Sequence, residues 1–151
     1  MGSIGSAVAR KAAGLGFEVV CWSRSLSAGS RSRGGYRVVE LDELARTCDV
    51  ISLHTALTEE TRHLVDERLI SLMRPETVIV NTSRGAVVDT AALARALEEG
   101  RLWGAGIDVF ETEPIERDDP LLKAPRTVFT PHAAYWSEES GVELRIRACR
   151  A

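Results

Sequence analysis

Three side chains of complementary chemistry stand shortly after three separate β-rich runs in the second half of the chain. They are Arg84, Glu113 and His132. A guanidinium binds a carboxylate through two parallel hydrogen bonds, and an imidazole gains or loses a proton near neutral pH. A carboxylate beside the imidazole favours its charged form and fixes the orientation of the ring. Together the three groups could bind a 2-oxo acid by its carboxylate and protonate the carbonyl oxygen during reduction, or run the reverse reaction on a 2-hydroxy acid.

This chemistry needs a cofactor, because no side chain can donate a hydride. The first residues, MGSIG, match the second half of a GxGxxG loop, which grips a dinucleotide pyrophosphate at a helix N-terminus. Gly2, Ser3, Ile4 and Gly5 would supply the GxxG part and the start of the helix. The first glycine of that motif and its strand are missing, and a bare GxxG is also found at ordinary helix starts. We therefore expect NAD(P) at this end of the chain.

The end of the second strand in such a fold indicates which dinucleotide binds. An acidic residue there normally accepts the ribose hydroxyls of NAD. After the run EVVCW, this chain has Ser23, Arg24 and Ser25 instead. An arginine flanked by hydroxyls can bind a 2′-phosphate, so NADP(H) is favoured over NAD(H). A solvated loop that tolerates either cofactor is the alternative.

The elements that must position these groups follow an alternating pattern, in which short β-rich runs are separated by amphipathic stretches. The expected strands are residues 18–22, 36–40, 49–54, 77–81, 105–110 and 127–131. The expected helices are residues 3–13, 41–48, 66–73 and 89–99. Asp66 and Asp89 stand at N-cap positions, and Gly100 stands where a helix should end. The pattern predicts a doubly wound, Rossmann-like α/β domain, truncated at the N-terminus, with ligands beyond the carboxyl ends of its strands.

The composition argues against several other classes of protein. With 151 residues, 44% hydrophobic and 27% charged, the chain suits one ordinary globular domain. A net charge of −3 with interleaved acidic and basic residues argues against direct nucleic-acid binding, and no apolar run is long enough to span a membrane. No histidines or cysteines stand at metal-ligand spacing, and we expect a cytoplasmic protein. The opening also fits N-myristoylation at Gly2, but no second membrane signal follows.

Five blocks of the sequence carry a family resemblance: GSIG, ISLHTALTEETRHLV, VNTSRGAVVD, GAGIDVFETEP and TPHAA. Their order and approximate spacing resemble the D-isomer-specific 2-hydroxyacid dehydrogenases, and the likeness covers essentially the whole chain. It implies that Arg84 binds the substrate carboxylate, His132 is the acid/base and Glu113 is its partner. It also implies that Asp108 hydrogen-bonds the nicotinamide carboxamide. Further residues match positions lining the cofactor cleft, namely Thr55, Thr58, Thr82 and Ser83.

Within that family, the tail TPHAAYWSEES is most similar to the C-terminal binding protein branch, which includes transcriptional corepressors. That branch usually has Trp directly after HAA, whereas this chain has Tyr135 and then Trp136. Two functions therefore stay open. One is a dehydrogenase acting on a small 2-oxo or 2-hydroxy acid, and the other is a dinucleotide-sensing binding module of the corepressor type. An inactive fragment is a third possibility.

The resemblance also predicts the domain organisation. Residues 1–136 would form the dinucleotide-binding domain, without its first strand and first loop glycine. Residues 137–151, with Ser137 as N-cap, would begin the helix that returns to an absent substrate domain. The missing strand would lie between residues 18–22 and 49–54 in the sheet, so the chain alone is expected to be marginally folded and inactive. Relatives are commonly homodimers. Of the other histidines, we expect His54 to be structural and His63 to be solvated.

Overall fold

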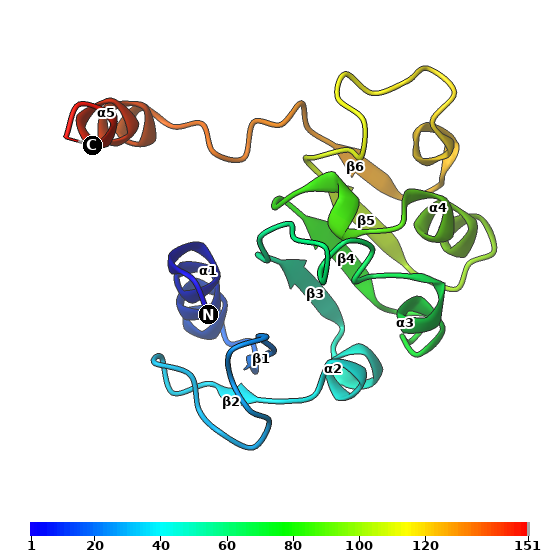
Figure 1. Ribbon diagram of the computed structural model, residues 1–151. Coiled ribbons are helices and arrows are strands. Elements are labelled where there is room, and N and C mark those ends of the chain that lie inside the picture. Colours follow the sequence, from blue (N-terminus) through cyan, green and yellow to red (C-terminus); the bar gives the residue numbers. More distant parts are fainter. Residues whose placement is uncertain (151) are drawn as a thin grey trace.

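The computed structural model describes residues 1–150. Its central element is a four-stranded parallel sheet in the order β3-β4-β5-β6 (Figure 1). The strands are β3 (Val50–Leu53), β4 (Val78–Asn81), β5 (Gly104–Ile107) and β6 (Thr127–Phe129). Ile51 pairs with Ile79, and Ile79 with Ala105, so that one layer of buried apolar side chains crosses three strands. The Rossmann-like α/β fold expected from the sequence is confirmed.

Helices on one side of this sheet enclose the core (Figure 1). They are α2 (Leu41–Thr47), α3 (Glu67–Ser71) and α4 (Thr90–Glu98). Two 3₁₀ turns follow strands of the sheet, η1 (Gly85–Val87) after β4 and η2 (Pro120–Lys123) after β5. Asp66 accepts a hydrogen bond from the Leu69 amide at 2.7 Å, and Asp89 accepts one from Ala92 at 2.9 Å, which confirms both N-caps. α4 packs against α3 and η2, and Leu93 is completely buried there.

The N-terminal part of the chain forms a second, smaller unit of structure. Helix α1 (Ser3–Gly14) leads into β1 (Val20–Cys21), which pairs in parallel with β2 (Arg37–Val38). Both strands are shorter than the expected residues 18–22 and 36–40. Within residues 1–150, β1 and β2 form a two-stranded sheet of their own, and no strand joins β1 to β3. Val50, at the start of β3, is accordingly 47% exposed.

The C-terminal helix α5 (Glu138–Ala148) stands away from the sheet at the end of an extended segment (Figure 1). Ser137 accepts a hydrogen bond from the Ser140 amide at 3.0 Å, and the Ser140 hydroxyl accepts one from the Ser137 amide at 2.9 Å. The expected N-cap is therefore present, as part of a capping box. No residue of α5 is buried.

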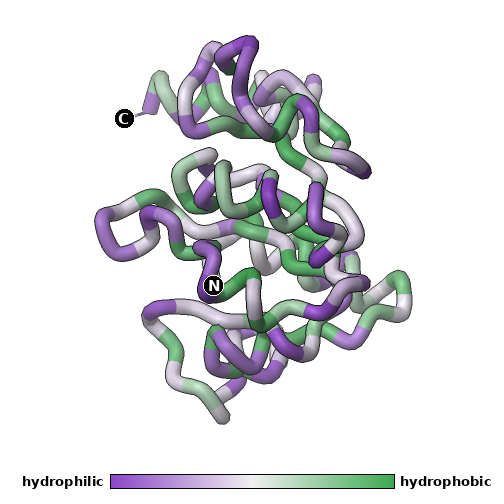
Figure 2. The backbone as a smooth tube through the Cα atoms, turned by 90° about the vertical axis from the view of Figure 1, so that its right-hand side faces the viewer, coloured by the Kyte–Doolittle hydropathy of each residue, from purple (hydrophilic) through white to green (hydrophobic). Residues whose placement is uncertain are grey.

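The distribution of hydropathy along the chain agrees with a buried core and a polar surface (Figure 2). Hydrophobic stretches run through the middle of the chain trace, and hydrophilic stretches occupy much of its outer loops. In the part of the chain that the structure describes, no helix has both the length and the apolar character needed to cross a bilayer.

Candidate active site

Arg84 lies in a turn that is fixed by a buried asparagine at the end of β4. The Asn81 side chain donates a hydrogen bond to the Arg84 carbonyl at 3.0 Å and accepts one from the Ser83 amide, also at 3.0 Å. Gly85 then passes so close to the next loop that a Cβ there would lie 1.9 Å from the carbonyl carbon of Phe110. The turn is thus held from its own strand and from the loop after β5. Sequence reasoning missed Asn81, although a polar residue ending an apolar strand is a usable signal.

Glu113 lies in the loop after β5 and joins that loop to His132. One carboxylate oxygen accepts a hydrogen bond from the Phe110 amide at 3.0 Å, and the other lies 2.8 Å from Nδ1 of His132. The hydrogen bond from Phe110 lowers the pKa of Glu113, and the His132 ring and the charge of Arg84 lower it further. Glu113 is therefore an ionised partner for the imidazole at neutral pH.

The loop that carries His132 is held by the buried residue Asp108. The loop after β6 donates to that carboxylate from the Thr130 hydroxyl and from the amides of Ala133 and Ala134, at 2.8 and 3.0 Å for the two amides. The His132 amide donates to the Asp108 carbonyl at 2.8 Å, and His132 itself has a positive φ of 52°. Burial raises the pKa of Asp108, but these hydrogen bonds outweigh it and the pKa is lowered. Asp108 thus fixes the loop that presents the imidazole.

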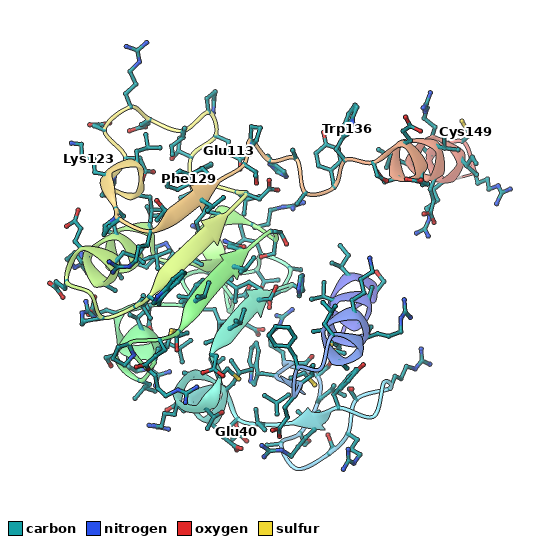
Figure 3. All side chains as sticks on the ribbon, turned by 180° about the vertical axis from the view of Figure 1, so that it is seen from behind. Glu40, Glu113, Lys123, Phe129, Trp136 and Cys149 are labelled. Carbon is teal, nitrogen blue, oxygen red and sulfur yellow. The ribbon has the colours of Figure 1, made fainter. Side chains whose placement is uncertain are left out.

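This arrangement leaves the other ring nitrogen of His132 available. With Nδ1 bonded to Glu113, Nε2 has no hydrogen-bond partner among residues 1–150. Arg84 is exposed on the same strand-end rim, where Nη1 donates to the Ser83 carbonyl at 2.7 Å. Figure 3 shows Glu113 near the strand ends, where the chain leaves the sheet toward Trp136. The three groups expected from the sequence therefore lie at one edge of the sheet, with a free proton-transfer atom and a free guanidinium face.

The N-terminus of α1 has the features of an anion-binding site. Gly2 is its N-cap without a side-chain hydrogen bond, and the first turn contains no acidic residue. The amides of that turn are therefore free to bind a phosphate. No atom lies within 4 Å of a Cβ built on Gly2, whereas one on Gly5 would approach the His54 side chain at 3.4 Å. Ser3 and Ile4 are exposed. These features fit a dinucleotide pyrophosphate.

Arg24 does not stand free at the end of β1. It donates to the Thr58 hydroxyl at 3.1 Å and forms an ion pair with Glu60 at 2.7 Å. The flanking hydroxyls of Ser23 and Ser25 lie 3.2 Å apart and bond each other. The arginine is thus tied to the loop after β3. Sequence reasoning did not anticipate the acidic partner.

The remaining expected cofactor residues follow strands at the same edge of the sheet. Thr55 and Thr58 come after β3, and Thr82 and Ser83 come after β4. Near them, Nε2 of His54 lies 2.9 Å from the Ser52 hydroxyl, and burial lowers the pKa of His54. A neutral, hydrogen-bonded ring agrees with the structural role expected for His54.

The expectation that His63 is solvated holds only in part, because its side chain is 40% exposed but also contacts a carboxylate. His63 lies in a turn with φ of 49°, and its Nε2 is 2.8 Å from the Glu111 carboxylate. No sequence motif links these two residues, which are far apart in the chain. Their contact arises only when the loop after β5 folds over the segment that precedes α3.

Comparison with known proteins identifies the family of this chain. Residues 1–134 match the model of the D-isomer specific 2-hydroxyacid dehydrogenase family, NAD binding domain. A glyoxylate reductase of Korarchaeum cryptofilum is 46% identical over 140 residues, covering 93% of this chain and 42% of that protein. A solved structure of a D-lactate dehydrogenase of Aquifex aeolicus, complexed with NAD and lactic acid, is 35% identical and gives a TM-score of 0.86. The match covers 99% of this chain and 49% of the chain of that enzyme.

A second solved structure contains the phosphorylated dinucleotide. It is an acyclic imino acid reductase in complex with NADPH and D-Arg, with a TM-score of 0.89 and 31% identity, covering 98% of this chain and 46% of that one. The chain thus spans a little under half the length of the proteins it matches. The strand-end site and the match over residues 1–134 lead to one conclusion: the chain belongs to the D-isomer specific 2-hydroxyacid dehydrogenase family and carries its NAD-binding domain.

Proposed function

We propose that this protein transfers a hydride between a nicotinamide dinucleotide and a small 2-oxo acid, producing a D-2-hydroxy acid. The observation that carries the proposal is the contact between His132 and Glu113, with Nδ1 2.8 Å from the carboxylate, on the rim that also holds Arg84. Glyoxylate reductase and D-lactate dehydrogenase relatives support this substrate class. Proton transfer and carboxylate binding are the two tasks that the reaction requires of the protein.

Each of the three residues has a separate task in the proposed reaction. Arg84 binds the substrate carboxylate through its exposed guanidinium and so orients the neighbouring carbonyl. The dinucleotide, when bound, supplies the hydride to the carbonyl carbon. His132 gives a proton from Nε2 to the carbonyl oxygen, while Glu113 holds Nδ1 and balances the charge of the ring. In the reverse direction, Nε2 takes the proton of the hydroxyl group.

The N-terminal elements would hold the cofactor. The free amides at Gly2, Ser3, Ile4 and Gly5 suit the pyrophosphate. The family resemblance assigns the cofactor cleft to further residues, namely Thr55, Thr58, Thr82, Ser83 and Asp108. Ser23 and Arg24 favour NADP(H) over NAD(H), because they stand at the end of β1 where an NAD-binding protein normally has an acidic residue. Glu60 weakens that preference, because it already binds the arginine.

The organisation of the whole protein is also part of the proposal. Residues 1–136 act as the dinucleotide-binding domain, and residues 137–151 begin a connection to a substrate domain. The absence of buried residues in α5 supports this, since a helix with exposed Val142, Leu144 and Ile146 has an apolar surface to cover. The active form would be a homodimer in the cytoplasm.

The decisive test measures turnover in the protein that carries this chain. NADPH and NADH oxidation would be followed with glyoxylate, hydroxypyruvate and pyruvate. We expect turnover with at least one of them, and a fall of about a hundredfold or more in His132→Asn, because general acid catalysis contributes about 10²–10⁴-fold. Arg84→Gln should mainly raise the KM for the oxo acid. Tight dinucleotide binding without any turnover would contradict the proposal and favour a dinucleotide-sensing module.

A further inference from the structure

We infer that His63 and Glu111 form a positioning pair that holds the Glu113–His132 dyad and the Arg84 turn in register. The inference rests on the proposed function, for which these three residues do the chemistry. Neither His63 nor Glu111 would touch the substrate. Their effect would pass through the Phe110–Glu111 peptide, which both active-site loops contact.

Glu111 binds two other elements at once. One carboxylate oxygen lies 2.8 Å from Nε2 of His63, and the other accepts a hydrogen bond from the Thr90 amide at 2.8 Å, at the N-terminus of α4. Burial raises the pKa of Glu111, but the hydrogen bonds from His63 and Thr90 outweigh it, so the pKa is lowered. Glu111 is therefore an ionised clamp between the loop after β5, the segment before α3 and the start of α4.

The partner of this clamp is itself held firmly. The His63 amide donates to the Ala86 carbonyl at 2.8 Å, and the Val65 amide donates to the Val87 carbonyl at 3.0 Å. Val65 and Val87 are almost completely buried. His63 is thus fixed to the backbone that directly follows Arg84.

Both active-site groups depend on the peptide that Glu111 anchors. Glu113, which orients His132, accepts its other hydrogen bond from the Phe110 amide at 3.0 Å. A Cβ on Gly85, next to Arg84, would lie 1.9 Å from the Phe110 carbonyl carbon and 2.3 Å from the Glu111 nitrogen. A shift of this peptide therefore moves the proton-transfer group and the carboxylate-binding turn together.

Stability alone does not account for the pair. The side chains of His63 and Glu111 are 40% and 27% exposed, and a polar contact between partly exposed side chains adds little to global stability. A misplacement of about 1 Å at a reacting group, by contrast, can lower a rate by about a hundredfold. The main expected consequence is on the geometry of the site.

The test compares Glu111→Ala and His63→Leu with His63→Gln, in which an amide can still donate to Glu111. We expect both disruptive variants to lower kcat by about tenfold with the dinucleotide KM unchanged, as expected for misplaced reacting groups. His63→Gln should recover most of the rate. The double variant should be no worse than Glu111→Ala alone, because both changes remove one interaction.

A second readout does not depend on turnover. The chain has only three histidines, so ¹⁵N-histidine NMR can follow the His132 ring, with His63→Leu assigning one of the other signals. Glu111→Ala and His63→Leu should both shift the His132 Nδ1 resonance, and His63→Gln should largely restore it. If Glu111→Ala does not fold, the two His63 variants carry the comparison.

The matched control is Glu67→Gln, which breaks ion pairs of similar length from α3 to Arg95 on α4 and to Arg101 after the end of α4. It should change neither kcat nor the His132 signal. An equal loss in this control, or unchanged kcat and His132 resonance in an active enzyme carrying His63→Leu, would overturn the inference. Shifted His132 resonances in a protein that reduces no 2-oxo acid would uphold the positioning role and refute the proposed function.

Discussion

The proposed site is built on two regions of the chain that differ greatly in how many apolar side chains they bury. The hydrophobic core lies within residues 45–124, where Leu93, Leu97 and Ile79 are completely buried. In residues 1–40, the buried apolar side chains are mainly small, namely Ala9, Cys21, Val38 and Val39. Ile4, Leu15 and Phe17 are exposed in the same region, at 67%, 79% and 58%. The residues proposed for substrate and proton chemistry thus lie on or next to the rigid region, whereas residues 2–5 and 23–24 of the proposed dinucleotide site lie in the loose one.

This difference has a structural cause. The strands β1 and β3 are not joined within residues 1–150, so their facing backbone groups lack ladder partners. Each unpaired group costs about 1–3 kcal/mol where it is shielded from water. A bound dinucleotide would therefore stabilise the N-terminal region more than the sheet β3–β6, which is already paired along its length.

The broadest expected effect, because it covers whole elements, is in hydrogen exchange of the isolated 151-residue chain. Amides of β4 and β5 should open with a free energy about 3 kcal/mol or more above that of α1 and β1, since local stability follows burial and pairing. This chain alone should show no 2-oxo acid turnover. Equal protection in both regions, or one cooperative melt accompanied by turnover, would remove the distinction between them.

A pair of glycine substitutions tests the same contrast at single positions. Gly85→Ala places a methyl group 1.9 Å from the Phe110 carbonyl carbon, and the three nearest atoms all belong to the Phe110–Glu111 backbone, which cannot move aside as a flexible side chain could. We expect a loss of about 4 kcal/mol or more in unfolding free energy, or no folded protein at all. Gly2→Ala meets no atom within 4 Å and keeps a negative φ of −75°, so its effect should stay within about 0.5 kcal/mol. Urea unfolding of both variants would measure the difference, and comparable losses would argue against a rigid Arg84 turn.

The regions also differ in how well their sequence predicts them. The alternating pattern located β3 to β5 closely, because buried parallel strands read as continuous apolar runs. Residues 18–22 and 36–40 each contain a Val-Val pair, but only Val20–Cys21 and Arg37–Val38 form strands, because each has only one paired neighbour. Strand-end position was sufficient to predict that Arg84, Glu113 and His132 lie at one edge of the sheet, while their roles stay a prediction. The contacts of Glu111 with His63 and of Glu60 with Arg24 were not predictable, because they depend on how loops distant in sequence fold over one another.

Asp108→Asn should have an intermediate effect, confined to the rigid region. Its carboxylate accepts three hydrogen bonds from the loop that carries His132, so we expect a loss of about 1–3 kcal/mol near neutral pH. Because its pKa is lowered on folding, the stabilisation is present above the unfolded value of about 3.9 and is lost as the pH falls through the lower folded value. The variant should therefore be less stable than the wild type at neutral pH and closer to it below about pH 3.

Urea unfolding across this range, with Asp118→Asn in an exposed loop as control, checks both statements. A constant gap between variant and wild type would show that ionised Asp108 is not what holds the loop.

The smallest effect concerns the loose region and its cofactor preference. Glu60 holds Arg24 through an exposed contact of 2.7 Å, and such pairs are worth at most about 1 kcal/mol. Glu60→Gln removes a negative charge next to the proposed 2′-phosphate site, so NADPH should bind up to about fivefold more tightly while NADH binding stays the same. Arg24→Gln should weaken NADPH binding selectively.

Titration of intrinsic fluorescence with each dinucleotide measures both variants, and Glu59→Gln, an exposed neighbour, controls for net charge. Equal changes for NADPH and NADH would mean that Arg24 does not face the 2′-phosphate, and cofactor choice would then have to be sought outside the end of β1.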